Sequence, residues 1–541
     1  MLNGEPMYLK GDVVAEPLFA GWYVWPHLIS PATCAMNVAG RHLKIMDSFI
    51  QAPQVHAAAV KNPKMMGGPF IDQPVTRVEE IKRLRDETAI RQAPLMQFAS
   101  ATRQLTALLQ KEASGFSLNA LYDKIPEPLR GYVELGYDLQ NRPSYRFYEP
   151  LLYRSPYYDR GAQSLALHQA DTDDRPFVLS TPRLPDSGTV PLDLPFASPV
   201  LDKLFRMRSE PGSYPEVREA LQIPDAQESL FRSFFTPAEP AHRERYQGDG
   251  IRVRYLGHAC LLVESRHVSI MSDPIVSYPH AGAVPRFTWD DLPPVIDYVV
   301  ITHNHQDHVL VETLLQLRPF IRNVVVPRCG GGELQDPSLK LVLQALGFAS
   351  VIELDELESI EVPGGRLTGV PFMGEHADLN IRAKLCHYAS LEGRSVLFAA
   401  DSSAVDPMVY KRVQEAIGNV DVLFLGMECD GAPLSWLYGP LLPEPVARDK
   451  DRSRRLAGSN YEQALQMVER FSPQEVYVYA MGQEPWLNHI MSLKYTEQSN
   501  PIVESNRLVK ECETRGIRAE RLFGMKEMIY GGGKLCQSMA S

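Results

Sequence analysis

The sequence predicts an α/β protein in which a mixed α+β N-terminal domain precedes a C-terminal sheet sandwich with helices on its outer faces. After residue 250, short apolar runs first follow one another closely and later alternate with segments of helical periodicity. This pattern indicates packed sheets covered by helices. Before residue 245 the chain is irregular and rich in Pro, Tyr and Asp. We therefore predict an N-terminal domain over residues 1–245 and a catalytic domain over residues 246–541.

The N-terminal part contains few periodic segments. Helical spacing of apolar residues predicts helices at 75–85, 95–111 and 215–221, and short aromatic or β-branched runs predict strands at 145–148, 151–153 and 177–179. None of these segments carries a motif of recognisable chemistry. We interpret this domain as one that packs, dimerises and shapes a substrate channel. Pro, Gly and charged residues at 235–250 are typical of an interdomain connector.

The C-terminal part begins with a strand meander and continues with alternating elements. Apolar runs predict strands at 251–255, 260–263, 268–271, 298–301, 323–326, 351–354, 367–370, 379–387, 395–400, 420–425 and 475–479. Helical periodicity predicts helices at 309–317, 339–346, 406–417, 460–471 and 503–515.

Composition limits the function. The chain has 541 residues, of which 44% are hydrophobic, and a net charge of −11, which is typical of a globular protein and argues against nucleic acid as a partner. Its seven cysteines form no Cys-x-x-Cys pair, as in proteins of a reducing compartment. No charged segment followed by an apolar one opens the chain, and prolines interrupt the apolar stretch 17–36. We therefore expect a cytoplasmic protein without a signal peptide or membrane span.

A cluster of metal-binding side chains follows the apolar run 299–301. His303, His305, Asp307 and His308 lie within six residues, directly after a segment typical of a buried strand. Side chains two residues apart point the same way in an extended chain, so His303 and His305 can face one ion, and Asp307 and His308 can reach a second. Such donors suit Zn, Fe, Mn, Cu or Ni. The alternative, a polar loop of solvated histidines, is rare for so dense a cluster in a chain with 14 histidines.

Further donors follow other predicted strands. Glu375 and His376 come after the strand at 367–370, Asp401 follows the strand at 395–400, and His489 lies beyond the strand at 475–479. Each of them alone could cap a helix or bond to a backbone carbonyl, and an isolated histidine is more often structural than metal-binding. Two ions nevertheless need more donors than one loop supplies, so we interpret these residues as the rest of a dinuclear site.

This pattern resembles the metallo-β-lactamase superfamily, whose members are αββα sandwiches with a dinuclear metal site at one edge. The resemblance covers residues 250–523. It implies the following ligands: His303 and His305 for the first ion, Asp307, His308 and His489 for the second, and Asp401 as the bridge. It also implies that Asp273 supports the metal loop. His258 is similar to the early histidine of the lactonase and phospholipase-D branch.

One position leaves two chemistries open. Most members of the superfamily have a histidine where this chain has Glu375 followed by His376. With His376 the first ion has three imidazoles, a set that suits a zinc- or manganese-dependent hydrolase of the lactonase or phosphodiesterase type. With Glu375 the site gains a third carboxylate, and hard anionic ligands suit a diiron pair that reacts with O2. A metal-free binding module is disfavoured because every ligand position holds a competent residue.

Over its whole length the chain resembles the CmlA-type diiron β-hydroxylases of chloramphenicol biosynthesis. The resemblance rests on the long N-terminal domain and on the segments Gly-Glu-His-Ala-Asp-Leu-Asn-Ile at 374–381 and Gly-Met-Glu-Cys-Asp-Gly at 426–431. It implies that Glu375 is an iron ligand and that Glu428 is a carboxylate near the centre with a catalytic role.

The same resemblance implies a reaction and its partners. Such enzymes use two irons and O2 to hydroxylate the β-carbon of an amino acid, expected here to be aromatic. The amino acid is held as a thioester on a carrier domain of a nonribosomal peptide synthetase, in antibiotic biosynthesis. A homodimer is also implied. Because no Gly-x-Gly-x-x-Gly follows a strand and no cysteine set suits an iron–sulfur cluster, we expect the external electron donor to be a separate reductase.

Overall fold

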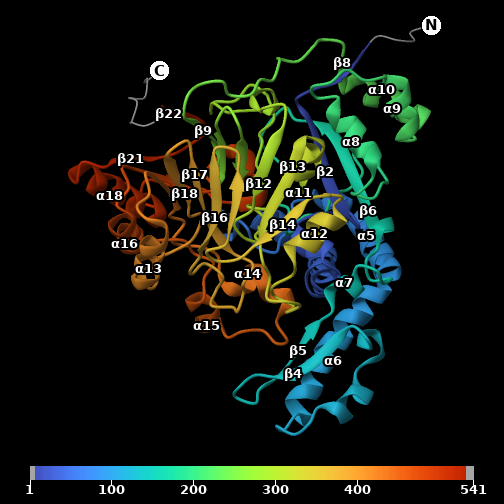
Figure 1. Cartoon of the computed structure of the whole chain (residues 1–541). Helices are drawn as coiled ribbons and strands as arrows, with labels where there is room; N and C mark the ends of the chain where they lie inside the picture. Colours follow the sequence, from blue (N-terminus) through green and yellow to red (C-terminus); the bar gives the residue numbers. More distant parts are fainter. Residues whose placement is uncertain (1–5, 532–541) are drawn as a thin grey trace.

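The C-terminal half of the chain is built from two seven-stranded sheets packed face to face (Figure 1). The structure is a computed structural model and describes residues 6–531. The first sheet contains, in spatial order, β14 (Val351–Leu354), β13 (Ile321–Pro327), β12 (Ile296–Val300), β11 (Ser269–Ser272), β10 (Cys260–Glu264), β9 (Ile251–Gly257) and β22 (Lys526–Tyr530). The second contains β15 (Ser359–Val362), β16 (Gly365–Pro371), β17 (Leu385–Leu391), β18 (Arg394–Phe398), β19 (Val422–Gly426), β20 (Glu475–Tyr479) and β21 (Arg518–Arg521).

Both sheets are antiparallel on one side and parallel on the other. In the first sheet β9, β10 and β11 pair antiparallel, whereas β11 to β14 run parallel, with Val300 opposite both Ser272 and Val325. In the second sheet β18 to β21 run parallel, with Phe424 opposite Phe398 and Tyr477. Because parallel strands end at the same edge of a sheet, the loops after β11, β12 and β18 lie close together.

A hydrophobic core lies between the two sheets, and helices cover their outer faces. Val263 and Val300 of the first sheet pack with Phe398, Phe424 and Tyr477 of the second in this core. The outer face of the second sheet packs against α13 (Pro407–Ile417), α16 (Tyr461–Phe471) and α18 (Asn500–Thr514). The first sheet packs against α11 (Val311–Leu317), α12 (Leu339–Ala345) and the N-terminal domain. The remaining helices of this half are α14 (Leu434–Tyr438), α15 (Arg448–Ser453) and α17 (Asn488–Met491).

The N-terminal domain is built around a four-stranded antiparallel sheet. Its strands, in spatial order, are β3 (Trp22–Tyr23), β2 (Val13–Phe19), β6 (Gln163–Gln169) and β7 (Val190–Leu192). Two strand pairs stand apart, β1 (Tyr8–Leu9) with β8 (Phe235–Thr236) and β4 (Val133–Tyr137) with β5 (Pro143–Phe147). The helices are α1 (Pro26–Ile29), α2 (Pro31–Asn37), the π-helical turn η1 (Val38–His42), α3 (Leu43–Gln51), α4 (Pro53–Ala59), α5 (Val78–Arg91), α6 (Ala93–Glu112), α7 (Glu149–Leu152), α8 (Pro199–Arg206), α9 (Tyr214–Ala220) and α10 (Glu228–Ser233).

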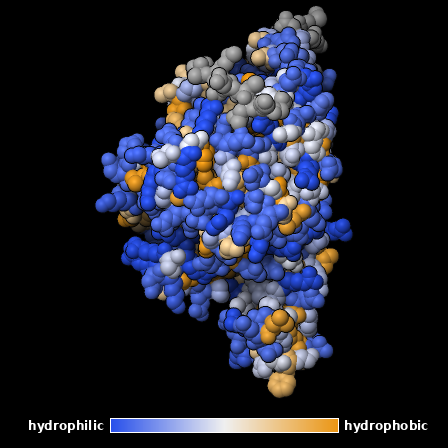
Figure 2. All heavy atoms as spheres, turned by 60° about the vertical axis from the view of Figure 1, so that its left-hand side comes forward, coloured by the Kyte–Doolittle hydropathy of each residue, from blue (hydrophilic) through white to orange (hydrophobic). Residues whose placement is uncertain are grey.

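Short 3-10 helices connect the larger elements. They are η2 (Pro63–Met65), η3 (Val75–Arg77), η4 (Asn119–Lys124), η5 (Glu127–Leu129), η6 (Arg160–Ala162), η7 (Asp225–Gln227), η8 (Trp289–Asp291), η9 (Arg318–Phe320), η10 (Gly439–Leu441) and η11 (Pro485–Leu487). The hairpin of β4 and β5 and the end of α6 form a projecting lobe (Figure 1). The face shown in Figure 2 is mostly hydrophilic, and the lobe carries exposed Phe116 and Leu139.

Buried ion pairs join the two halves of the chain. Glu16 of β2 and Glu312 of α11 each lie 2.6 Å from Nη2 of Arg175, and all three side chains are almost fully buried. Arg183 contacts the other oxygen of Glu16 at 2.8 Å. The N-terminal domain is therefore fixed against the helix that follows the metal-binding loop.

The structure confirms most of the predicted elements and corrects three. Residues 151–153, predicted as a strand, belong mainly to helix α7, because Pro150 at its first turn favours a helix start. The predicted strand 177–179 is a turn, in which Thr181 N–H donates to the carbonyl of Phe177. The predicted strand 379–387 begins only at Leu385. The boundary at residue 245 stays a prediction.

Two further expectations concern thiols and membranes. Six cysteines lie within the described residues and all are free thiols, whereas Cys536 lies outside that part of the chain. No helix among residues 6–531 is long and apolar enough to cross a bilayer.

Candidate metal centre

Asp273, which directly follows β11, fixes the loop that carries the predicted ligands. Its Oδ1 accepts a hydrogen bond from Thr302 N–H at 2.8 Å, and its Oδ2 accepts one from the Thr302 hydroxyl at 2.6 Å. The same Oδ2 lies 2.8 Å from Nδ1 of His308. One fully buried carboxylate therefore holds both ends of the loop between Thr302 and His308, as the resemblance implies.

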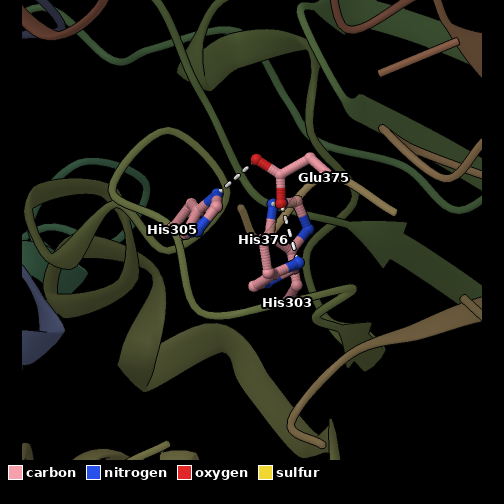
Figure 3. A group of neighbouring side chains, drawn as sticks. All are labelled: His303, His305, Glu375 and His376. Atoms are coloured by element: carbon pink, nitrogen blue, oxygen red, sulfur yellow. Dashed lines mark ion pairs between the residues drawn. The ribbon is translucent and has the colours of Figure 1, made fainter. Parts of the chain in front are cut away.

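His303, His305, Glu375 and His376 form one group of donor atoms that lie within 4.8 Å of one another. Figure 3 shows the carboxylate of Glu375 between His305 on one side and His303 and His376 on the other. Oε1 of Glu375 lies 2.8 Å from Nδ1 of His305, and Oε2 lies 3.7 Å from Nε2 of His303. Glu375 thus faces both histidines that are predicted to bind the first ion.

The backbone around Glu375 is unusual. Glu375, Ala377 and Asp378 all have positive φ values of 65, 52 and 55°, a conformation that non-glycine residues adopt at a cost of about 1 kcal/mol or more each. This turn follows β16 and brings both Glu375 and the adjacent His376 to the site. Nδ1 of His376 lies 2.9 Å from Oε2 of Glu375.

Asp401 lies between the two predicted ion positions. Its Oδ2 is 3.0 Å from Nε2 of His308 and 3.9 Å from Nε2 of His303. These three residues form a second group of potential ligands. A carboxylate that faces one histidine of each pair has the placement expected of a bridge.

The hydrogen bonds determine which ring nitrogen of each histidine is free for a metal. The Thr302 hydroxyl donates to Asp273, so it accepts from Nδ1–H of His303, and Nε2 of His303 keeps its lone pair. Nδ1–H of His308 donates to Asp273, which leaves Nε2 free in the same way. Nε2 of His303, Oε2 of Glu375 and Oδ1 of Asp401 are buried and have no hydrogen-bond partner among the described residues. Buried nitrogen and oxygen atoms that lack hydrogen-bond partners and face one another are suited to bind metal ions.

His258 approaches the second position but has a different role. It forms a group with Asp307 and His308, and its Nε2 lies 3.1 Å from Oδ2 of Asp307. Its Nδ1 accepts a hydrogen bond from Gly482 N–H at 3.1 Å, so in the neutral ring Nε2 carries the proton and donates to Asp307. His258 therefore orients Asp307. The glycine-histidine pair at the end of β9 is the sequence signal that pointed to it.

His489 lies apart from the site, in contrast to the sequence prediction. None of the groups formed by the described residues includes it. Helix α17 turns its ring towards the N-terminal domain, where it makes an edge contact with Tyr23 at 5.9 Å and lines a separate cavity of about 130 Å³ with Arg175 and Glu312. The structure thus brings six of the seven predicted ligands together and leaves His489 out.

The electrostatics of the site favour cations. Burial lowers the pKa of a histidine, yet Asp307, Asp401 and Asp273 raise the pKa of His308 well above its usual range. Burial alone would raise the pKa of Asp307, but His308 and His258 hold it well below its usual range. The closely spaced carboxylates thus create a negative field in a buried site.

A cavity of about 450 Å³ opens onto the centre. Glu428, which follows β19, lines this cavity together with Asp401 and Glu375. The hydroxyl of Tyr495 donates to Oε1 of Glu428 at 3.2 Å. Burial, followed by the nearby charge of Asp401, raises the pKa of Glu428 to about 8. Glu428 is thus a carboxylate in the cavity that has no cationic side chain in hydrogen-bond contact within the described residues.

Comparisons with known proteins identify the family. Residues 8–240 match the family described as diiron non-heme beta-hydroxylase N-terminal domain, and residues 269–478 match the beta-lactamase superfamily domain. A protein of Streptomyces venezuelae, 4-amino-L-phenylalanyl-[CmlP-peptidyl-carrier-protein] 3-hydroxylase, is 41% identical over 523 residues, which cover 95% of this chain and 98% of that protein. The chain belongs to the CmlA-type diiron β-hydroxylases.

Solved structures agree with this assignment. The crystal structure of CmlA, a diiron beta-hydroxylase from Streptomyces venezuelae, superimposes with a TM-score of 0.90 at 38% identity and covers 97% of this chain and 99% of that one. A mutant of the same hydroxylase gives a TM-score of 0.88 at 38% identity, with coverage of 96% and 99%.

Membership in this family confirms several expectations. The protein is a diiron non-heme β-hydroxylase with an N-terminal domain and a metallo-β-lactamase domain, which decides the choice between oxygenase and hydrolase. The histidines and carboxylates of the site suit iron, because imidazole and hard oxygen donors bind it in both of its common oxidation states.

Proposed function

We propose that this CmlA-type β-hydroxylase acts on an aromatic amino acid that is held as a thioester on a nonribosomal peptide synthetase carrier domain, in the biosynthesis of an antibiotic. The observation that carries the proposal is the 41% identity to the 4-amino-L-phenylalanyl carrier-protein 3-hydroxylase, over nearly the full length of both chains. The proposal specifies an aromatic side chain, and the test below compares several amino acids.

We assign the ligands from the geometry of the donor atoms. His303, His305 and Glu375 would hold the first iron, Asp307 and His308 the second, and Asp401 would bridge the two. Two irons held by these residues would supply the oxidising power for the insertion of one oxygen atom from O2 into a C–H bond. The contact between Glu375 and His305 supports Glu375 rather than His376 as the ligand, because Nδ1 of His305 faces the carboxylate directly.

The other residues of the site orient and isolate the ligands. Asp273 keeps Nδ1 of His308 protonated, and His258 donates to Asp307, so each ligand presents an unprotonated atom to the metal. His303 and His308 are fully buried. Their burial shields these two imidazoles from solvent.

We propose that Glu428 binds the α-ammonium group of the substrate. In an aminoacyl thioester the amine is bonded to the carbon next to the β-carbon, so a carboxylate that holds it must lie close to the centre. Glu428 lines the cavity beside Asp401, and Tyr495 holds its carboxylate. A cation in this position would offset the cost of burying Glu428. This gives Glu428 a substrate-positioning role during catalysis.

The walls of the cavity suit an aromatic side chain. Trp436, Leu437, Leu456 and Met491 line it together with the carboxylates. Apolar walls with a few convergent polar groups are typical of sites that bind small aromatic substrates.

We propose that the enzyme interacts with a carrier domain, a reductase and a second copy of itself. The carrier domain delivers the substrate, and a separate reductase supplies electrons. We also expect a homodimer, which the solution mass of the purified protein tests directly.

The test of the function uses carrier domains loaded with phenylalanine, tyrosine, 4-aminophenylalanine or leucine. Reduced enzyme is added in air, and the intact mass of each carrier is measured. We expect at least one aromatic substrate to gain the mass of one oxygen atom and leucine to gain none. Metal analysis of protein made without added metal should find about two irons per chain; zinc, together with ester cleavage that needs no O2, would contradict the proposal.

A further inference from the structure

A second cavity lies next to the one that holds the metal site. It has a volume of about 500 Å³ and shares Gly67, Pro433 and Trp436 with the first cavity. Its remaining walls come largely from the N-terminal domain. The second cavity is therefore the continuation of the substrate pocket on the other side of Trp436.

Trp436 forms the partition between the two cavities. Its Nε1–H donates to the carbonyl of Gly67 at 2.9 Å, and its ring lies 6.2 Å from that of Phe177. This hydrogen bond is one of those that join helix α14 to the N-terminal domain. A rotation of the indole would connect the outer cavity with the metal site.

A buried cation lines the outer cavity without a carboxylate beside it. Arg41 is only 9% exposed, and its Nη2 donates to the carbonyls of Trp436 and Leu437. Its Nη1 has no hydrogen-bond partner, and no ion pair to Arg41 occurs within residues 6–531. Burial lowers the pKa of its guanidinium to about 10. An unpaired buried charge is costly, so this arrangement indicates a site for an anion.

The local fold presents Arg41 together with other polar groups. Arg41 lies in the π-helical turn η1, and Lys44 and Ser48 follow at helical spacing and line the same cavity. π-helical turns are rare and occur often at functional sites. Gly40 allows close approach here, because a Cβ atom at this position would lie 3.2 Å from Pro440. Lys44 is exposed at the mouth of the cavity and forms no ion pair within the described chain.

We propose that the outer cavity binds the 4′-phosphopantetheine arm of the carrier domain, with Arg41 and Lys44 as the binding site for its phosphate. This inference rests on the proposed function, which requires a tethered substrate. A guanidinium with a free N–H and a nearby ammonium recognise phosphate through charge-assisted hydrogen bonds. Continuity with the cavity that opens onto the proposed metal site gives the thioester end of the arm a path past Trp436.

The test measures binding to the iron-loaded, full-length enzyme by calorimetry with three probes: 4′-phosphopantetheine, pantetheine without the phosphate, and inorganic phosphate. We expect phosphopantetheine to bind about ten-fold more tightly than either of the other probes, and added salt to weaken its binding. Lys44→Glu should remove most of this preference. Lys411→Glu, on helix α13 of the opposite face, is the matched control and should keep it. Lys44 is preferred to Arg41 for substitution because Arg41 also holds two carbonyls of α14.

Two results would overturn the inference. Equal affinity for pantetheine and phosphopantetheine would show that the cavity does not bind the phosphate group. Inorganic phosphate that binds as tightly as the full arm would show an adventitious anion only. Hydroxylation of loaded carriers separates this inference from the proposed function. If the wild-type enzyme adds no oxygen to any carrier, the proposed function fails although the phosphate preference stands. If it hydroxylates the carrier and Lys44→Glu leaves the KM for that carrier unchanged, the anion site fails.

Discussion

The hydroxyl of Tyr438 lies 2.9 Å from Nε2 of His305, and the opposite nitrogen of that ring faces Glu375. Tyr438 ends helix α14, whose carbonyls are held by Arg41 of the N-terminal domain. Arg41 and helix α14 therefore link the outer cavity to His305, a proposed iron ligand. The N-terminal domain positions the centre as well as covering it.

Tyr438→Phe removes the hydrogen bond that orients His305. Loss of such a partner typically weakens metal binding by about 10- to 100-fold, so we expect the variant to lose iron to a chelator faster than the wild type. The measurement is the rate of iron release, followed by absorbance of the chelate. Tyr477→Phe, in the core between the sheets, is the control and should leave the rate unchanged. Equal rates for all three proteins would mean that Tyr438 does not orient the ligand.

Asp273→Asn disturbs the second position. Both carboxylate oxygens of Asp273 accept hydrogen bonds, whereas an asparagine side chain accepts only through its oxygen. One N–H or O–H of Thr302 or His308 is therefore left unpaired, or the ring of His308 changes its tautomer. We expect about 10- to 100-fold weaker binding of one iron per chain, measured by metal titration. Asp421→Asn is matched to it, because Asp421 accepts bonds from Ser395 in the second sheet, far from the centre. Full retention of both irons in Asp273→Asn would contradict the assigned tautomer of His308.

Glu149 makes stability depend on pH. Burial raises its pKa from 4.5 to about 7, so the folded state binds a proton that the unfolded state releases above 4.5. The stabilising effect of this proton is complete below pH 4.5 and is lost as the pH rises to about 7, which amounts to about 3 kcal/mol at most. Glu149→Gln should therefore be more stable than the wild type at about pH 8 and equal to it at about pH 4.5. Denaturant unfolding at both pH values checks this.

Exposed Glu497→Gln serves as the control for that comparison. It should change the free energy of unfolding equally little at both pH values. A constant difference between Glu149→Gln and the wild type across this range would show that Glu149 is ionised in the folded protein.

Arg175→Met breaks the buried ion pairs between the two halves of the chain. Glu312 would keep only the hydroxyl of Tyr278 at 2.7 Å, and Glu16 would keep Arg183 alone. Removing one partner of a buried pair costs about 3–5 kcal/mol, which we expect as a lower denaturant midpoint. Adding Glu312→Gln to the variant should restore part of the loss, since the unpaired charge is removed. If the double variant is no more stable than the single one, the cost does not come from the unpaired carboxylate.

The metal-binding loop is predictable from the sequence because its predicted ligands are close together in the chain. Four predicted ligands lie within six residues after a β-branched run. Strands β16 and β18 both pair antiparallel with β17, so they end at the same edge of the second sheet. Asp401 and Glu375 therefore reach the site although they are far away in sequence. Glu428 follows β19 in the same way.

His489 shows the limit of that reasoning. Its position after β20 matches the family pattern, but the direction of its side chain depends on the short helix α17 and on packing against Tyr23, which no local spacing reveals. The structure of the N-terminal domain is even harder to predict from the sequence. Its strands β2 and β6 are buried along most of their length, so they lack the polar alternation that marks a half-exposed strand. Pro150 is the local signal that argues for helix α7, and it outweighs the apolar run that follows.

The source of the added oxygen tests the central conclusion most directly. Reduced enzyme with a loaded carrier is exposed to isotopically labelled O2 in ordinary water, and the mass of the carrier-bound product is measured. We expect the product to gain one labelled oxygen atom from O2, and Glu375→Ala to abolish this gain. Product oxygen that comes from water, or labelled oxygen that appears equally in Glu375→Ala, would contradict a diiron β-hydroxylase that depends on Glu375.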